Sequence, residues 1–169
     1  WQCYELSSLM NMPSVMAPVL HYLFHRLAQR FDGSPTLLIL DEAWLFLDHP
    51  LFAKQIREWL KSLRKQNVGV VFATQSVSDA LNASITSSLL ESCPSRIFLP
   101  NDRAWEPQVQ ADYERLGLNE KQLQLLATAK PKQQYYFQST AGNRLFDLLL
   151  QPIALAFCAA STPQDKQLI

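Results

Sequence analysis

The sequence has no excess charge, few cysteines and no long apolar run. Its fifteen basic and fifteen acidic side chains cancel, so no global field is present that would drive strong non-specific binding to nucleic acids or acidic membranes. Cys3, Cys93 and Cys158 are odd in number, far apart and in no C-x-x-C pair, which excludes a disulfide framework and a zinc ribbon. Residues 153–160 form the longest apolar run near the end and are far shorter than the ~20 residues that span a bilayer. We expect a protein of a reducing cytoplasm with no transmembrane segment.

The pattern of apolar residues predicts an α/β fold. A length of 169 residues with 48% apolar composition suits one compact domain. Aliphatic runs alternate with amphipathic helical stretches over the first hundred residues, which predicts a mostly parallel sheet with helices on both faces. Two further helices and a β-hairpin with a loop at 140–143 follow. The predicted strands are 1–6, 36–40, 68–73, 96–99, 133–139 and 144–150. A first helix is expected after Pro13, with an apolar stripe from Val15 to Leu27, and the other predicted helices are 50–66, 76–91, 104–115, 119–129 and 152–160, with Asn119 and Gln122 as a capping-box pair.

Two acids follow the first aliphatic run directly. Residues 37–40 deliver Asp41 and Glu42 to the carboxyl edge of the predicted sheet, where ligands bind in open α/β folds. In nucleotide hydrolases the first such acid holds the Mg²⁺ shell and the second orients and deprotonates the attacking water. The alternative is structural, because an acid can also simply end a strand and begin a solvated turn.

The next aliphatic strand also ends in polar residues, Thr74 and Gln75. The carboxyl ends of parallel strands lie at one edge, so Gln75 is expected to face the γ-phosphate and the attacking water as a phosphate sensor. The alternative is that Thr74 and Ser76 cap the following helix and that Gln75 is incidental. The same polar ending on both strands favours the catalytic interpretation.

The phosphate-binding loop of such enzymes is absent from these residues. None of the four glycines begins or ends a G-x-x-x-x-G-K-[ST] loop. The sequence also starts without methionine and without the layout of a secretory signal. We therefore expect residues 1–169 to be the carboxy-terminal portion of one nucleotide-hydrolase domain, beginning after that loop.

Four segments carry a resemblance to a known family. Residues 35–44 (PTLLILDEAW), 59–67 (WLKSLRKQN), 72–76 (FATQS) and 97–101 (IFLPN) resemble, in this order, the TrbE/CagE family of conjugal-transfer and type IV secretion ATPases. The resemblance covers nearly the whole chain. It implies a RecA-like P-loop NTPase fold and a motor that hydrolyses Mg-ATP to power pilus assembly or substrate transfer.

The resemblance also implies roles for particular residues. Glu42 and Gln75 would be catalytic, Asp41 would hold Mg²⁺ through water, and Thr74 and Lys65 would contact the ATP-Mg²⁺ complex. Arg64 would act at a neighbouring subunit's phosphate in a homo-oligomer, for which a hexamer is one form. Cations at the carboxyl end of a helix also complement its dipole, so Arg64 and Lys65 have a structural alternative. The expected location is the cytoplasmic side of the bacterial inner membrane, peripheral to it and beside other secretion components.

Two other functional classes stay open on the sequence alone. One is a catalytically inert assembly or docking module of the same machine. The other is a DNA-translocating, helicase-like ATPase, since an Asp-Glu-Ala run also begins helicase acidic motifs, although the neutral charge gives no indication of DNA binding.

Several conspicuous residues have structural explanations. His21 and His25 are four apart but lack the acid of an H-E-x-x-H site, so no metal is expected there. We expect packing or interface roles for the tryptophans, which are Trp44, Trp59 and Trp105. Three further arginines are weaker candidates than Arg64 for acting at a neighbouring subunit's phosphate, and surface roles are expected for most of them; these are Arg96, Arg103 and Arg144.

Overall fold

The computed structural model describes residues 1–6, 9, 12–42 and 50–159. The chain forms two compact units, Trp1–Ser92 and Cys93–Ile169, and each is described by itself. Ala43 and Trp44 of the acidic segment lie outside the described residues. None of the helices in the described ranges is long and apolar enough to cross a membrane.

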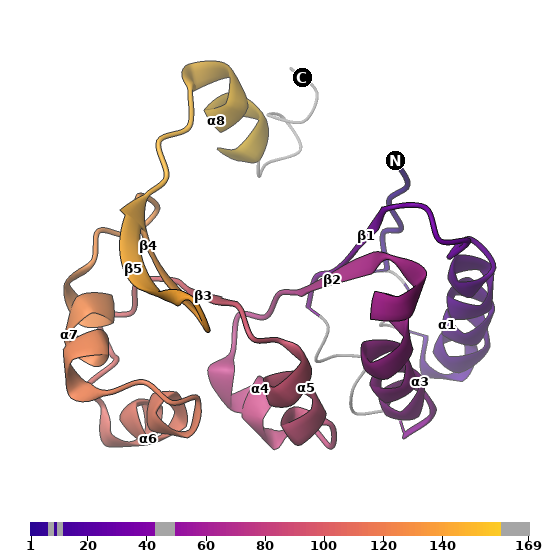
Figure 1. The fold of residues 1–169 in the computed structure, drawn as a ribbon, viewed down its shortest axis with the longest axis horizontal. Helices are drawn as coiled ribbons and strands as arrows, with labels where there is room; N and C mark the ends of the chain where they lie inside the picture. Colours follow the sequence, from indigo (N-terminus) through magenta and orange to yellow (C-terminus); the bar gives the residue numbers. More distant parts are fainter. Residues whose placement is uncertain (7–8, 10–11, 43–49, 160–169) are drawn as a thin grey trace. The chain divides into compact units, whose positions relative to one another are not determined.

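The first unit alternates helices with two strands (Figure 1). Pro13 begins the first helix, where its missing N–H costs no intrahelical bond. The elements are α1 (Pro13–Ala28), β1 (Thr36–Leu40), α3 (Pro50–Ser62), the 3-10 helix η2 (Leu63–Gln66), β2 (Val68–Phe72), α4 (Val77–Asn82) and α5 (Thr86–Ser92).

Strands β1 and β2 are parallel and in register. Thr36 pairs with Val68 and Leu40 pairs with Phe72, and the backbone N–H of Ala73 donates to the carbonyl of Leu40 at 2.9 Å. The parallel sheet predicted for these two segments is confirmed. Both strands therefore end at the same edge.

One face of this sheet is packed against α1 and α3, which lie side by side in Figure 1. Trp59 is 6% exposed. The centroid of its ring lies 5.0 Å from that of Phe24 and 5.5 Å from that of Phe31, and both contacts are edge to face. The packing role predicted for Trp59 is confirmed. The buried cluster is Leu20, Phe24, Leu38, Phe52, Ala53, Ile56, Trp59, Leu63, Val68 and Ile85.

The opposite face of the sheet is accessible. Leu37 is 62%, Ile39 50% and Val71 45% exposed, because successive side chains of a strand point to opposite faces and the buried cluster occupies only one. A continuous aliphatic run such as residues 36–40 is typical of a strand buried on both faces, but the exposure of Leu37 and Ile39 shows that this strand is buried on one face only.

The second unit is built on an antiparallel sheet with the order β3-β4-β5. Arg96 pairs with Gln138, and Gln134 pairs with Asp147. Helices α6 and α7 contribute buried side chains beside those of the sheet, among them Tyr113, Leu123 and Tyr136. The elements are β3 (Arg96–Phe98), α6 (Pro107–Arg115), α7 (Glu120–Thr128), β4 (Gln134–Ser139), β5 (Gly142–Asp147) and α8 (Pro152–Ala159).

Four details differ from the expectations. Residues 1–6 form no strand, since strand formers need a partner ladder for their backbone groups. Strand β3, predicted to continue the parallel alternation, pairs antiparallel with β4. The helix predicted at 76–91 is two helices, with the Thr86 hydroxyl donating to the carbonyl of Ala83 where the second begins. The hairpin turn is shorter than predicted, because β5 already begins at Gly142, whose φ of 138° suits glycine.

Candidate functional site

The site residues predicted from the ends of the two parallel strands lie at the same edge of the sheet. Asp41 and Glu42 come directly after β1, and Thr74 and Gln75 come shortly after β2. Because Leu40 and Phe72 are paired at the ends of the strands, these segments leave the sheet next to each other. Asp41, Thr74 and Gln75 are exposed and Glu42 is half-buried.

A hydrogen bond joins the two segments. The side-chain amide of Gln75 donates from Nε2 to the Glu42 carboxylate oxygen Oε1 across 33 residues of sequence. Hydrogen bonds to an ionised carboxylate are roughly twice as strong as those between neutral groups. Gln75 and Glu42, predicted to share a site, are thus in direct contact.

The backbone of Glu42 is in the left-handed region, with φ of 50°. This conformation is uncommon for residues other than glycine and is concentrated at functional sites. The N–H of Glu42 donates to Oδ1 of Asp41 at 3.1 Å. The turn after β1 is therefore fixed by the Asp41 carboxylate while the Glu42 side chain reaches Gln75. No residue preference indicated this conformation beforehand.

Thr74 makes local contacts in the turn that precedes α4. Its hydroxyl donates to the carbonyl of Ser76 at 3.1 Å and accepts from the N–H of Ser76 at 3.2 Å. This arrangement matches the structural alternative for Thr74, a turn before a helix. Gln75, which lies between the two, is left pointing toward Glu42.

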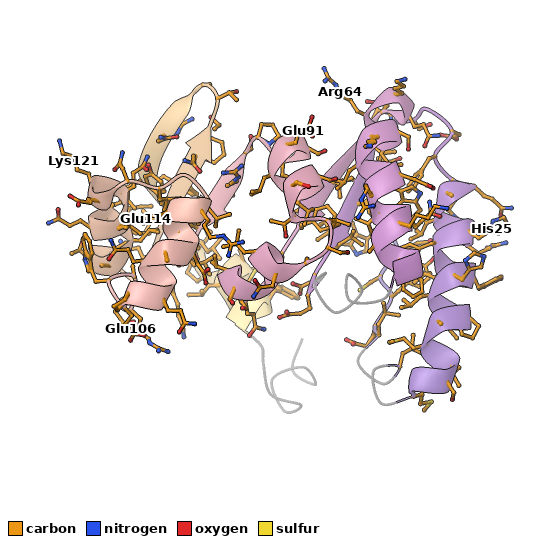
Figure 2. All side chains as sticks on the ribbon, turned by 90° about the horizontal axis from the view of Figure 1, so that it is seen from below. His25, Arg64, Glu91, Glu106, Glu114 and Lys121 are labelled. Carbon is orange, nitrogen blue, oxygen red and sulfur yellow. The ribbon has the colours of Figure 1, made fainter. Side chains whose placement is uncertain are left out.

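Arg64 and Lys65 lie at the other edge of the parallel strands. Both are exposed residues of η2, which ends just before β2 begins, and Figure 2 shows Arg64 at the outer end of this helical segment. Asn67 closes η2 in the left-handed conformation, and its carbonyl accepts from the N–H of Thr36 at 3.1 Å. A five-residue strand separates the two edges by roughly 13 Å or more. The structure therefore does not bring Arg64 and Lys65 together with Asp41, Glu42 and Gln75.

The other arginines have local partners. Arg96 donates to the carbonyl of Leu116 at 2.8 Å, and Arg144 lies over the ring of Phe137 at 5.8 Å. These contacts agree with structural roles for both residues.

Arg103 and Glu106 form an exposed ion pair with an N–O distance of 2.7 Å. The hydrogen bond from Arg103 holds the pKa of the Glu106 carboxyl below its ordinary value. Exposed pairs of this kind contribute little to stability, so the pair is a surface feature.

The carboxyl edge offers oxygen ligands of the kind that Mg²⁺ prefers. Asp41 presents an exposed carboxylate there, and Mg²⁺ in nucleotide enzymes is typically held by one or two carboxylates, water and substrate phosphates. A single acid therefore fits a metal held through water. Within the described ranges, no group of three or more His, Cys, Asp or Glu side chains is arranged to hold a metal by itself.

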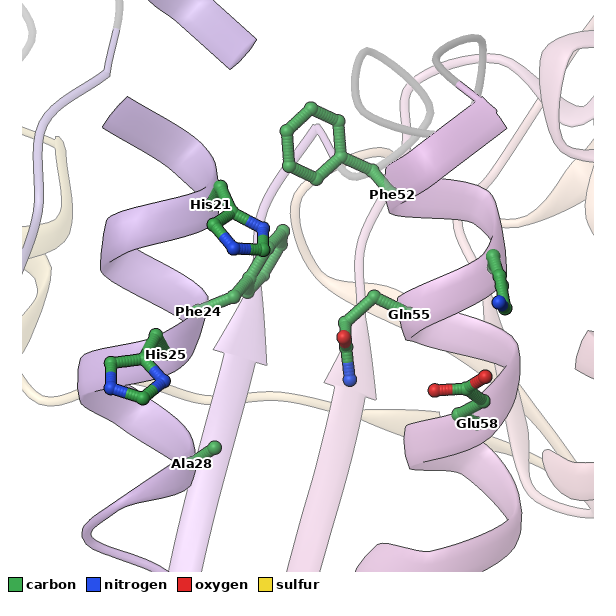
Figure 3. Close-up of a pocket in the computed structure, with 8 residues that line it drawn as sticks. His21, Phe24, His25, Ala28, Phe52, Gln55 and Glu58 are labelled. Carbon is green, nitrogen blue, oxygen red and sulfur yellow. The ribbon is translucent and has the colours of Figure 1, made fainter. Parts of the chain in front are cut away.

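A pocket that the sequence did not indicate lies between α1 and α3 (Figure 3). Its volume is about 320 Å³. Phe24 and Phe52 are its buried aromatic residues, and His21 and His25 line it from α1 while Gln55 and Glu58 line it from α3. None of the predicted site residues lines it.

The chain is similar in sequence to proteins of conjugal transfer and type IV secretion. The chain is 53% identical over 170 residues to the conjugal transfer protein TrbE of Rhizobium radiobacter, covering 100% of this chain and 21% of that protein. It is 35% identical over 148 residues to the type IV secretion system protein CagE of Helicobacter pylori, covering 87% of this chain and 15% of CagE. The chain thus spans about a fifth or less of the length of these relatives.

A solved structure and a family model show the fold and the family of the chain. The solved structure of VirB4 of Thermoanaerobacter pseudethanolicus superposes with a TM-score of 0.64 at 21% identity, covering 81% of this chain and 37% of that chain. The predicted α/β P-loop fold is confirmed by this likeness, and the predicted resemblance to TrbE and CagE is confirmed by the sequence matches. A sequence model of the TraG P-loop domain matches residues 4–140, and the chain belongs to that family.

Proposed function

We propose that the full-length protein containing this chain is an ATPase that hydrolyses Mg-ATP as the motor of a type IV secretion or conjugative transfer machine. The observation that carries the proposal is the contact between Glu42 and Gln75 at the carboxyl edge of two parallel strands. It is supported by similarity to TrbE, named as a conjugal transfer protein, and to CagE, named as a type IV secretion system protein.

Each residue of the edge has a proposed role. Glu42 accepts a proton from the attacking water, and Gln75 lies beside it. Asp41 holds the water shell of Mg²⁺, and Thr74 contacts the bound nucleotide. Mg²⁺, when bound with ATP, neutralises charge that develops on the phosphate oxygens. The phosphate-binding loop itself is absent from these 169 residues, so hydrolysis is proposed only for the full-length protein.

Arg64 and Lys65 are proposed to act on a neighbouring subunit. They are exposed, and they lie at the edge opposite to Glu42, too far to reach a phosphate bound at the carboxyl edge of the same chain. An arginine supplied in trans is worth ~10³-fold or more in the rate of phosphoryl transfer. A homo-oligomer, such as a hexamer, would bring Arg64 of one copy to the nucleotide of the next, with Lys65 beside it.

The proposed setting is supported by relatives that are named as proteins of conjugal transfer and type IV secretion. We infer that the protein works on the cytoplasmic side of the bacterial inner membrane, peripheral to it and assembled with other components of the secretion machine. A second candidate is a catalytically inert docking module, favoured by the exposed apolar side chains Leu37, Ile39 and Val71 on one face of the sheet.

Hydrolysis by the purified full-length protein separates the two candidates. A motor should release phosphate from ATP in the presence of Mg²⁺ and lose that activity when Mg²⁺ is chelated. Asp41→Asn should shift the Mg²⁺ dependence to higher concentrations, because a carboxamide attracts the metal's water shell less strongly. Absence of hydrolysis from correctly assembled protein at any Mg²⁺ concentration would favour the docking module.

A further inference from the structure

We propose that Gln75 is a positioning residue that acts through Glu42, holding the carboxylate that receives the water proton, and that it does not sense the terminal phosphate itself. The inference rests on the proposed function, since it requires Glu42 to be the general base. The place of Gln75 at the sheet edge permits two roles, contact with the terminal phosphate or positioning of Glu42, and we assign it the second.

The first observation is the direction of the Gln75 side chain. Its amide nitrogen donates to Oε1 of Glu42. Gln75 is flanked by Thr74 and Ser76, and two hydrogen bonds between these neighbours fix the backbone from which its side chain extends. The amide is therefore presented to Glu42 by a constrained turn.

The second observation is the conformation of Glu42. Its left-handed backbone and the bond from its N–H to Asp41 hold the main chain, but a glutamate side chain still has three rotatable bonds. A hydrogen-bond donor restricts the positions that such a carboxylate samples. The Gln75 amide is a donor of this kind.

The chemistry explains why restraint matters. In the proposed step an O–H bond of water breaks and its proton goes to the Glu42 carboxylate, while the water oxygen bonds to the terminal phosphorus and the bond to the ADP oxygen breaks. An amide neither gives nor takes a proton at neutral pH, so Gln75 is not itself the base, and its hydrogen bond to Glu42 gives it a means of positioning the base. A displacement of about 1 Å at a reacting group can cost ~10²-fold in rate.

A double-mutant cycle in the full-length protein tests the proposal. Gln75→Ala should lower kcat by ~10-fold or more with the KM for ATP changed by less than about threefold, because a misplaced base slows chemistry without weakening ground-state binding. In a Glu42→Gln background, Gln75→Ala should change the residual single-turnover rate by less than about twofold. The side chain at position 42 can then no longer accept the proton, so its position no longer affects the rate. Gln124→Ala, an exposed glutamine of α7, is the matched control and should leave kcat unchanged.

Binding supplies a readout that is independent of turnover. Gln75→Ala should leave the affinity for a non-hydrolysable ATP analogue, relative to that for ADP, within about threefold of wild type. Gln75→Met keeps the length of the side chain and removes its donors without adding charge, and it replaces the alanine variant in all measurements if thermal melting shows that the alanine variant is unfolded.

The outcomes are distinct. Rate losses that multiply in the double variant, an unchanged kcat in Gln75→Ala, or a tenfold selective loss of analogue affinity would each overturn the positioning role. Wild-type turnover in the single Glu42→Gln variant would instead show that the proposed function itself has assigned the wrong base.

Discussion

The position of Glu42 could be predicted from the sequence, but its backbone conformation could not. Its place after an aliphatic run indicated an acid at the sheet edge, and parallel pairing indicated that Gln75 lies nearby. The positive φ of Glu42 could not be predicted, because a glutamate adopts that conformation only where its surroundings impose it. The local hydrogen bonds of Thr74 were anticipated only as an alternative.

Trp59 gives a prediction about stability at the level of one side chain. Trp59→Ala should lower the free energy of unfolding by about 3–5 kcal/mol, since it empties a packed aromatic site between Phe24 and Phe31. Denaturant unfolding of the 169-residue chain, followed by circular dichroism, measures the change. Trp105, which is 46% exposed, is the matched control, and Trp105→Ala should change stability by about 1 kcal/mol or less. Equal losses in the two variants would contradict the assigned core.

Elements with local signals were predicted better than elements that depend on distant partners. The amphipathic stripe that includes Phe52, Ile56 and Leu63 predicted one helix over 50–66, because a helix satisfies its own backbone; the structure divides it into α3 and the 3-10 helix η2. A strand must find a partner, and residues 1–6 have strand-forming side chains but form no strand. The same reason explains the altered pairing of β3, whose partner β4 lies after two intervening helices.

The capping box of α7 gives a prediction for one element. The Asn119 side chain accepts from the N–H of Gln122 at 3.1 Å, and the Gln122 side chain accepts from the N–H of Asn119 at 2.8 Å. Asn119→Ala should therefore lower the free energy of unfolding of this unit by about 1 kcal/mol. Lys121→Ala, an exposed change in the same first turn, should stay within about 0.5 kcal/mol of wild type. Hydrogen exchange of the amides in α7 would report the loss locally, and unaltered exchange in Asn119→Ala would argue against the cap.

At the scale of the whole molecule, the 169-residue chain should neither bind ATP tightly nor hydrolyse it. The backbone N–H groups and lysine of the phosphate loop supply most phosphate contacts in this class of enzyme, and no such loop is present in the sequence. Isothermal titration calorimetry with Mg-ATP provides the test. A dissociation constant in the low micromolar range would show that the remaining residues suffice.

Assembly can be tested by mixing two defective full-length proteins. Glu42→Gln and Arg64→Ala should each be nearly inactive alone, while mixed oligomers contain some interfaces with an intact Glu42 on one side and an intact Arg64 on the other. We expect partial recovery of ATP hydrolysis on mixing. Arg26→Ala, which changes an exposed arginine of α1, should be active by itself. Proven co-assembly without recovery would remove Arg64 as the residue supplied in trans.

The most direct measurement of the proposed function is the turnover of full-length Glu42→Gln. The variant should bind Mg-ATP with wild-type affinity and hydrolyse it ~10²-fold or more slowly, because general-base catalysis contributes about that much to the rate. Glu91→Gln, which changes an exposed acid of α5, should have wild-type turnover. Wild-type turnover in Glu42→Gln as well would contradict the assignment of the carboxyl edge of β1 and β2 as the catalytic site.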